Sequence, residues 1–170
     1  MDDSTRLRES RMVFYRDDVA RIDASLNELI QLSGARAALL VDREGHLVSR
    51  VGDLRSVDAE TVAALVAGSF AATREMARVL GEEQFSVVFH QGKRDSIQLT
   101  LAGDRTILTV LFDDSTTAGM IRIYTNEAAK KLGGIFRDIE SRTDDQRPAV
   151  TIGADFDVNA KDRLDSLFPG

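Results

Sequence analysis

Apolar side chains recur along the chain with two different spacings, which separate expected helices from expected strands. From Asp17 or Asp18, spacings of three and four predict an amphipathic helix that ends near Ser33-Gly34. A second helix is predicted over 57–81, between capping residues and a terminal glycine. A third follows the polar loop 113–117. Its apolar stripe contains Ile121, Tyr124, Ala128, Leu132, Ile135 and Ile139.

Between these helices, five short runs have the composition of strands. The continuous apolar run 37–41 predicts a central strand that is covered on both faces, and the mostly apolar run 107–112 predicts a second central strand. Residues 47–51 return from the first of these as a hairpin, and 85–91 alternate apolar with other side chains. The strand 97–101 has one polar side, which is expected to face water or a partner. The order helix, two strands, helix, three strands, helix predicts an α+β domain built on a five-stranded antiparallel sheet.

The long helix 57–81 has an unusually small middle, and the rest of the chain is arranged around it. Its small residues are Ala63, Ala64, Ala67, Gly68, Ser69, Ala71 and Ala72. Composition alone favours tight core packing over contact with a partner, because alanine is also the best helix former. We expect the larger residues Val62, Leu65, Met76 and Val79 to cover the sheet. That arrangement leaves a face made of Ala64, Gly68, Ala71 and Glu75.

The pattern of charge and periodicity divides the chain into four parts. Residues 1–12 are expected to be a flexible arm, 13–141 the folded domain, and 142–154 a linker. Residues 155–170 form a C-terminal segment in which Leu164, Leu167 and Phe168 follow helical spacing. A helix this short is unstable alone in water, so it docks on its own domain or binds a partner. We favour the partner, because the linker lets the segment reach outward.

The composition of the chain excludes several classes of function. The net charge of -6 and the pI near 5.0 argue against sequence-independent binding of nucleic acid. There is no cysteine, which excludes disulfides and thiolate chemistry. The longest uncharged run, 61–73, is too short to span a bilayer, and no secretory signal is visible. We therefore expect a soluble cytoplasmic protein without membrane insertion.

Motifs for catalysis or metal binding are weak. His46 and His90 are not at metal-ligand spacing and are interpreted as surface or edge residues. Gly92-Lys93 lacks the remaining residues of a phosphate-binding loop and is interpreted as a hairpin turn. Asp113-Asp114 is interpreted as a helix start rather than a cation site. No nucleophile or general base is indicated, so we predict no catalytic, cofactor or metal site.

Arginine requires a separate test, because an arginine supplied in trans can complete the active site of a GTPase. Arg74 and Arg78 lie one helical turn apart with Glu75 between them, and Arg94 lies in a predicted turn. We interpret the helical pair as a solvated, ion-paired face.

The order of elements and several motifs resemble the Roadblock family over about residues 12–140. More closely, the chain resembles the bacterial branch that partners the small Ras-like GTPase MglA. The motifs that carry the resemblance are MVFYRDDVARI at 12–22, VDREG at 41–45, Ala67-Gly68 with Ala71-Ala72, Leu80-Gly81-Glu82, His90-Gln91-Gly92 and Leu111-Phe112-Asp113. The tail DRLDSLF is similar to the short helix that ends some members of this branch.

The resemblance implies a homodimer in which two sheets join edge to edge and the two long helices lie side by side. It also implies binding to the switch region of an MglA-type GTPase in its GTP-bound form, and faster GTP hydrolysis without an inserted arginine. Implied GTPase contacts are Ala64, Ala67, Gly68, Ala71, Ala72, Glu75 and Arg78. Leu164, Leu167 and Phe168 would form a second contact, and Phe85, Val87 and Phe89 the dimer edge. Nucleotide and Mg²⁺ would belong to the partner.

The same resemblance implies a role in cell polarity and surface motility, in the cytoplasm or concentrated at a cell pole. Two alternatives stay open. A Roadblock scaffold would bridge polarity proteins without changing GTP turnover. A small-molecule sensor is a third hypothesis, against which the lack of convergent polar residues counts.

Overall fold

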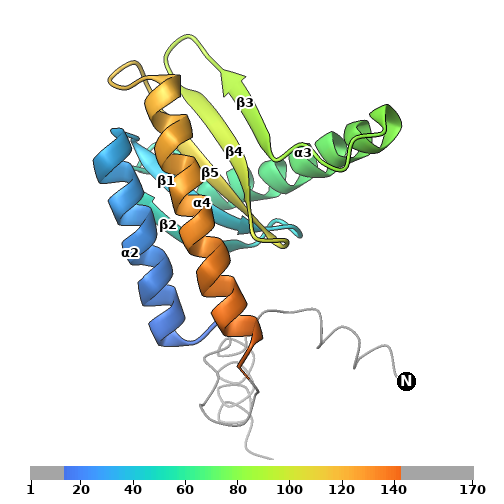
Figure 1. The fold of residues 1–170 in the computed structure, drawn as a ribbon. Coiled ribbons are helices and arrows are strands. Elements are labelled where there is room, and N and C mark those ends of the chain that lie inside the picture. Colours follow the sequence, from blue (N-terminus) through green and yellow to red (C-terminus); the bar gives the residue numbers. More distant parts are fainter. Residues whose placement is uncertain (1–13, 143–170) are drawn as a thin grey trace, which may run out of the picture.

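The computed structural model describes residues 14–142, which form five strands and three helices (Figure 1). The strands follow the alternating pattern of apolar residues, and the helices follow the 3.6-residue pattern. In chain order the elements are α2 (Arg16–Ser33), β1 (Ala37–Asp42), β2 (Leu47–Gly52), α3 (Ala59–Leu80), β3 (Val87–Gln91), β4 (Ser96–Ala102), β5 (Thr106–Phe112) and α4 (Ala118–Glu140). The predicted α+β class and element order are confirmed. The predicted arm, the C-terminal segment with Leu164, Leu167 and Phe168, and the predicted linker apart from Arg142 lie outside the described residues.

All neighbouring strands pair antiparallel, in the order β2-β1-β5-β4-β3. The first strand, β1, lies between β2 and β5, with Leu39 opposite Arg50 on one side and Thr109 on the other. Five of the six residues of β1 and all seven of β5 are buried, which confirms both as central strands. The sheet therefore has two edges, β2 and β3.

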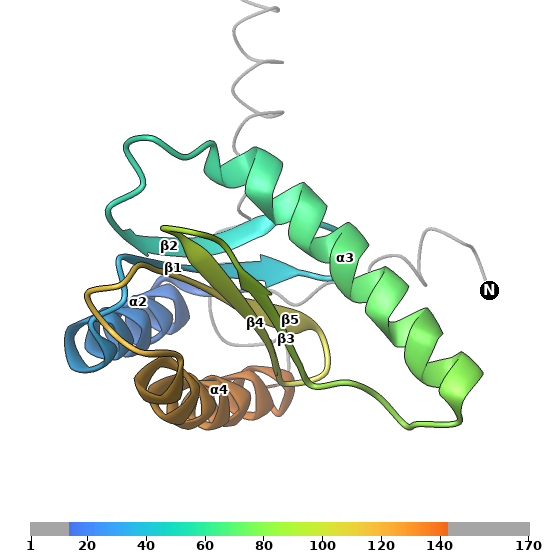
Figure 2. The same cartoon turned by 90° about the horizontal axis from the view of Figure 1, so that it is seen from above.

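The two faces of the sheet are covered differently (Figure 2). Helices α2 and α4 lie antiparallel on one face, where their apolar stripes meet Leu40, Leu108 and Val110. Helix α3 lies alone on the other face, over Leu39 and Ile107. Successive strand residues point to opposite faces, so each central strand supplies both cores.

One expectation about the sheet is wrong. The polar side of β4 was expected to face water or a partner, but Gln98 and Thr100 are buried on the face that α4 covers. The Gln98 amide donates a hydrogen bond to the Thr100 hydroxyl over 3.2 Å. Short polar side chains can be buried when they satisfy one another, and alternation alone does not distinguish this from a wet face.

The two ends of the domain meet. Asp18 is buried at the start of α2, where it accepts a hydrogen bond from the Tyr15 backbone N–H at 2.9 Å. Arg142, just beyond α4, pairs with the Asp18 carboxylate. The Arg142 guanidinium also lies 5.2 Å from the centre of the Tyr15 ring, a cation–π distance. One arginine thus joins the first and last helices.

Candidate protein-interaction surface

Helix α3 has strong end signals, as the sequence predicts. The Asp58 side chain caps the first turn by accepting from the Thr61 backbone N–H at 3.2 Å and from its hydroxyl at 2.7 Å. These hydrogen bonds lower the pKa of Asp58 below its ordinary value. At the other end, Gly81 takes a left-handed φ of 77°, and the Glu82 N–H donates to the Ala77 carbonyl at 2.9 Å.

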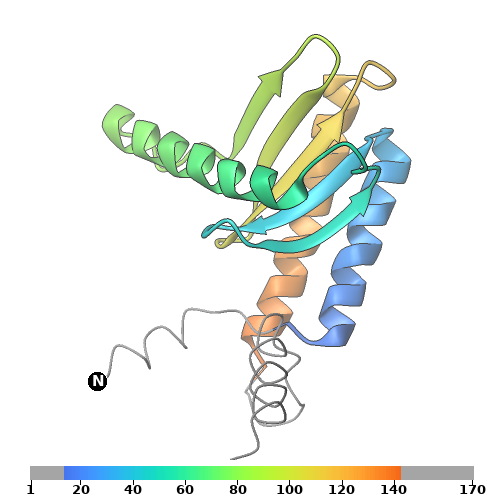
Figure 3. The ribbon, with the colours of Figure 1, turned by 180° about the vertical axis from the view of Figure 1, so that it is seen from behind.

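Only the first half of α3 rests on the sheet, while its C-terminal half extends beyond it (Figures 2 and 3). In the first half, Ala59, Ala63, Val66 and Phe70 are buried against β1 and β5. In the last ten residues the buried side chains are Thr73 and Ala77. A helix that continues for several turns beyond its own core leaves most of its circumference available to other molecules.

The prediction of which side faces the sheet is wrong for three of four residues. Val62 is partly buried against the core, as expected. Leu65, Met76 and Val79 are instead 68%, 55% and 72% exposed. Met76 and Val79 lie in the half of α3 that extends beyond the sheet. Near Leu65, small residues rather than large ones fit the close approach of α3 to the β1–β2 hairpin. A Cβ added to Gly45 in that hairpin would lie 3.1 Å from the Ala64 Cα.

The same close approach corrects the interpretation of Ala67. It is 8% exposed, and its Cβ lies 3.5 Å from the position that a Gly45 Cβ would occupy. Ala67 is therefore part of the contact between α3 and the hairpin, and we omit it from the candidate surface. The other predicted GTPase contacts on α3 are all exposed, namely Ala64, Gly68, Ala71, Ala72, Glu75 and Arg78.

Two neighbouring stripes run along the exposed side of α3. The small-residue stripe contains Ala64, Gly68, Ala71 and Glu75, spaced by four, three and four residues. Beside it lies the apolar stripe of Leu65, Ala72, Met76 and Val79. A Cβ added to Gly68 would meet no atom within 4 Å. Apart from Glu75, the two stripes together form an exposed surface of small and apolar residues that lies outside both cores.

The outer edge of the sheet lies on the same side as the projecting half of α3. Strand β3 pairs with β4 through Val87 and Phe89, and its other edge has no partner strand among residues 14–142. Phe89 is 43% exposed, and its ring stacks on Phe112 at 5.8 Å. Phe85, predicted as part of the edge, precedes the strand and lies under α3. The candidate dimer edge is therefore Val87 and Phe89 without Phe85.

Charged residues lie beside the small-residue stripe. Arg78 pairs with Glu75, with Nε 2.9 Å from the carboxylate, as the sequence indicates. Arg43, from the β1–β2 hairpin, and Arg74 line a small pocket between α3 and the sheet. Burial lowers the pKa of Arg43 from its ordinary value, and the nearby Arg74 charge lowers it further.

The remaining candidate motifs form local turns. His46 lies 3.0 Å from Asp42 in the β1–β2 hairpin, where the Asp42 carboxylate also accepts the His46 backbone N–H at 2.8 Å. Gly92-Lys93 is in the β3–β4 hairpin, as predicted. Asp113 accepts the Ser115 N–H at 2.9 Å, which contributes to its lowered pKa. The α4 cap is Thr117 rather than either aspartate.

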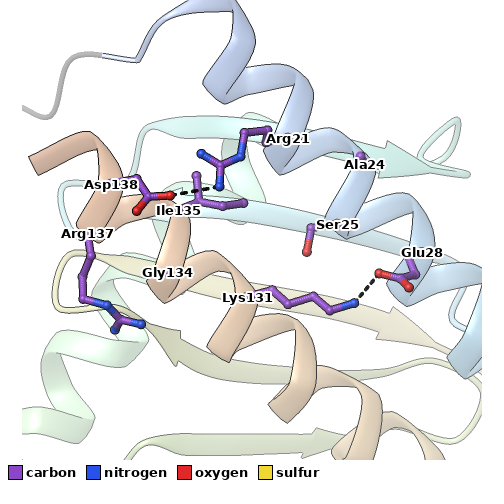
Figure 4. Close-up of a pocket in the computed structure, with 9 residues that line it drawn as sticks. All are labelled: Arg21, Ala24, Ser25, Glu28, Lys131, Gly134, Ile135, Arg137 and Asp138. Atoms are coloured by element: carbon purple, nitrogen blue, oxygen red, sulfur yellow. Dashed lines mark hydrogen bonds and ion pairs between the residues drawn. The ribbon is translucent and has the colours of Figure 1, made fainter. Parts of the chain in front are cut away.

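An open groove runs between α2 and α4 on the opposite face (Figure 4). The ion pairs Arg21–Asp138 and Glu28–Lys131 cross it. Between them lies Ser25, whose buried hydroxyl has no hydrogen-bond partner among the described residues. No sequence pattern indicates this groove, because its residues lie on two helices that are more than 80 positions apart in the chain. No helix within 14–142 combines the length and hydropathy needed to cross a bilayer.

Comparison with known proteins agrees with this geometry. The Roadblock/LC7 domain family matches residues 21–112. The MglB structure from Myxococcus xanthus is 34% identical and superposes with a TM-score of 0.73, covering 78% of this chain and 99% of that one. The gliding protein MglB from Thermus thermophilus is 32% identical with a TM-score of 0.70, covering 75% and 96%. An MglB structure with a tetrameric arrangement is 32% identical with a TM-score of 0.72, covering 75% of this chain and 96% of that one.

Proposed function

Because the chain belongs to the Roadblock/LC7 domain family, we propose that it is a homodimeric activator of a Ras-like GTPase of the MglA type. It has no active site of its own in this proposal, and it binds the GTP-bound partner through α3. The observation that carries the proposal is the exposed small-residue stripe, which has open space at Gly68. A surface of this kind lets the backbone of a partner approach closely.

Dimerisation would use the two features next to this stripe. The free edge of β3 would pair with its symmetry mate, and the apolar stripe of each α3 would pack against the other. Met76 and Val79 are more than half exposed in the single chain. Their burial in a dimer would remove apolar surface from water at about 25 cal/mol per Å². The similarity to MglB structures, one with a tetrameric arrangement, supports self-association.

Activation would work by positioning. A GTPase whose own side chains are poorly placed gains rate when a partner fixes its switch loops in the productive geometry. Two paired α3 helices would offer a rigid surface for this purpose, because each is capped at both ends and rests on the sheet. The ion pair between Arg78 and Glu75 would set the charge at one end of the contact.

The C-terminal segment would provide a second contact with the GTPase, through Leu164, Leu167 and Phe168. These residues lie outside the described part of the chain, and their helical spacing supports the idea. Replacing Leu167 and Phe168 together with alanine is expected to weaken GTPase binding and leave dimerisation unchanged. Isothermal titration and sedimentation measure the two quantities separately.

The similarity to MglB, including a protein described as a gliding protein, also supports a role in cell polarity and motility. The test measures single-turnover GTP hydrolysis by the cognate GTPase, monitored as phosphate release, at a saturating concentration of the Roadblock protein. We expect a faster rate. A complex that forms without acceleration would indicate a scaffold instead, and failure to bind the GTP-loaded partner would refute the proposal.

A further inference from the structure

Two arginines from different elements, Arg43 and Arg74, lie at one pocket of the described domain. Both line the pocket between α3 and the sheet, and both are exposed. Within residues 14–142, neither forms an ion pair with a carboxylate; Asp104 is close enough only to act at longer range. Two neighbouring cations repel each other, so an anion bound between them would be stabilised.

The surface between the two arginines is apolar. Ala67, Phe70, Phe85, Leu101 and Ile107 line the same pocket. Of these, Phe85 and Leu101 are only half-buried, so part of the surface is accessible to another side chain. The cavity itself, about 20 Å³, is too small to enclose a side chain. An apolar group would lie across its mouth, on Phe85 and Leu101, with a carboxylate beside the two arginines.

The chain itself contains such a ligand beyond Arg142. Residues 143–170 carry six acidic and three basic side chains, a net charge of -3. Near their end, Asp165 is followed three positions later by Phe168, and Leu164 precedes Phe168 by four. Residues at these spacings are neighbours on a helix, so a helical turn here would present a carboxylate beside two apolar side chains.

The reach of the chain permits this contact. The last described residue, Arg142, follows the end of α4. Near that end, Phe136 of α4 lies against the β4–β5 turn, where a Cβ on Gly103 would be 3.0 Å from the Phe136 ring. Leu101 and Ile107 of the pocket flank this turn. The 22 residues between Arg142 and Asp165 would span about 25 Å as a flexible chain, enough to pass around the end of the sheet.

We propose that the acidic–apolar segment 164–168 docks within its own chain onto the Arg43–Arg74 pocket when no GTPase is bound. Asp165 pairs with the arginines, and Phe168 covers the apolar surface beside Ala71. Docking then occludes one side of the small-residue stripe. The contact itself is independent of the proposed GTPase partner; only its regulatory consequence rests on that function.

The test uses the absence of cysteine from the natural sequence. Gln84→Cys at the pocket and Ser166→Cys in the segment give one possible disulfide, formed under mild oxidation of the purified full-length protein without GTPase. Asn27→Cys, exposed on α2 on the opposite face, replaces Gln84→Cys in the matched control. We expect the pocket pair to form an intrachain disulfide about tenfold faster than the control pair, because docking raises the local concentration.

Charge reversal examines the mechanism in the same assay. Asp165→Arg is expected to slow the pocket disulfide about tenfold, and adding Arg74→Asp to restore much of the rate. Equal rates for the pocket and control pairs would overturn the proposal. A disulfide that forms between two chains would also overturn it and would indicate docking in trans. The same holds if Asp165→Arg leaves the rate of disulfide formation equal to that of the parent pocket pair.

Discussion

Replacing Gly68 with arginine separates the interaction surface from the fold. A Cβ at this position meets no atom within 4 Å, and the residue is in the middle of α3 on its exposed side. Glycine lowers helix stability relative to arginine by about 0.5–1 kcal/mol, so the substitution is expected to stabilise the subunit. For a domain of this size, that raises the melting temperature by about 1–4 °C.

The same substitution is expected to disrupt GTPase binding. Forcing extra atoms into a close-packed contact costs about 1–3 kcal/mol, which weakens affinity about 5- to 150-fold. Isothermal titration against the GTP-loaded partner measures the affinity, and thermal unfolding measures the stability. Ala20→Arg, an exposed site on α2, is the matched control and should bind normally. A Gly68→Arg protein that binds and stimulates hydrolysis normally would refute the role of the small-residue stripe.

Three further predictions concern assembly and stability. Met76→Lys should weaken the dimer at least about tenfold in sedimentation experiments without destabilising the subunit; an unchanged dissociation constant would contradict the apolar stripe as an interface. Gly103→Ala should lower the free energy of unfolding by about 1–2 kcal/mol in urea, since φ is +64° and the new Cβ would crowd Phe136. Asp58→Ala should lower the melting temperature at neutral pH. Because folding depresses the Asp58 pKa, its stabilisation is complete above about pH 3.9 and is lost as pH falls through the folded pKa, so the difference should shrink in acid. A constant difference would contradict this.

Periodicity and end signals were sufficient to predict the fold. The buried stripe of α4, from Ile121 to Ile139, has the spacing of an amphipathic helix. The mostly apolar sequences of β1 and β5 are those of strands covered on both faces. Gly133 and Gly134 are unfavourable in the interior of a helix, yet α4 runs through them. Gly133 is buried, and a Cβ there would lie 3.9 Å from the Gly103 backbone nitrogen. A contact of this length leaves room for a Cβ, so packing does not require glycine at this position.

The orientation of α3 was predicted less well than its extent. Large apolar residues were expected to cover the sheet, because burying Leu65 or Met76 gains more than burying alanine. Near Leu65 the β1–β2 hairpin approaches too closely for that arrangement, through Gly45 from a different element. Met76 lies where α3 has passed the end of the sheet. Exposed Leu65 and Met76 then have to be explained by another molecule. The Arg43–Arg74 pair was missed for the same reason, since its members are 31 positions apart in the sequence.

The arginine that joins the ends of the domain has a consequence for how the protein can be handled and tethered. Tyr15, Asp18 and Arg142 bring the two ends together, so the chain enters and leaves the domain at one place. A tag, a fluorophore or a surface linkage at either end therefore starts from that side of the molecule. Force applied between the two ends would load the Asp18–Arg142 pair before the sheet. A circular permutant of the domain could join its two ends with a short loop and open the chain elsewhere, without changing the sequence of α3.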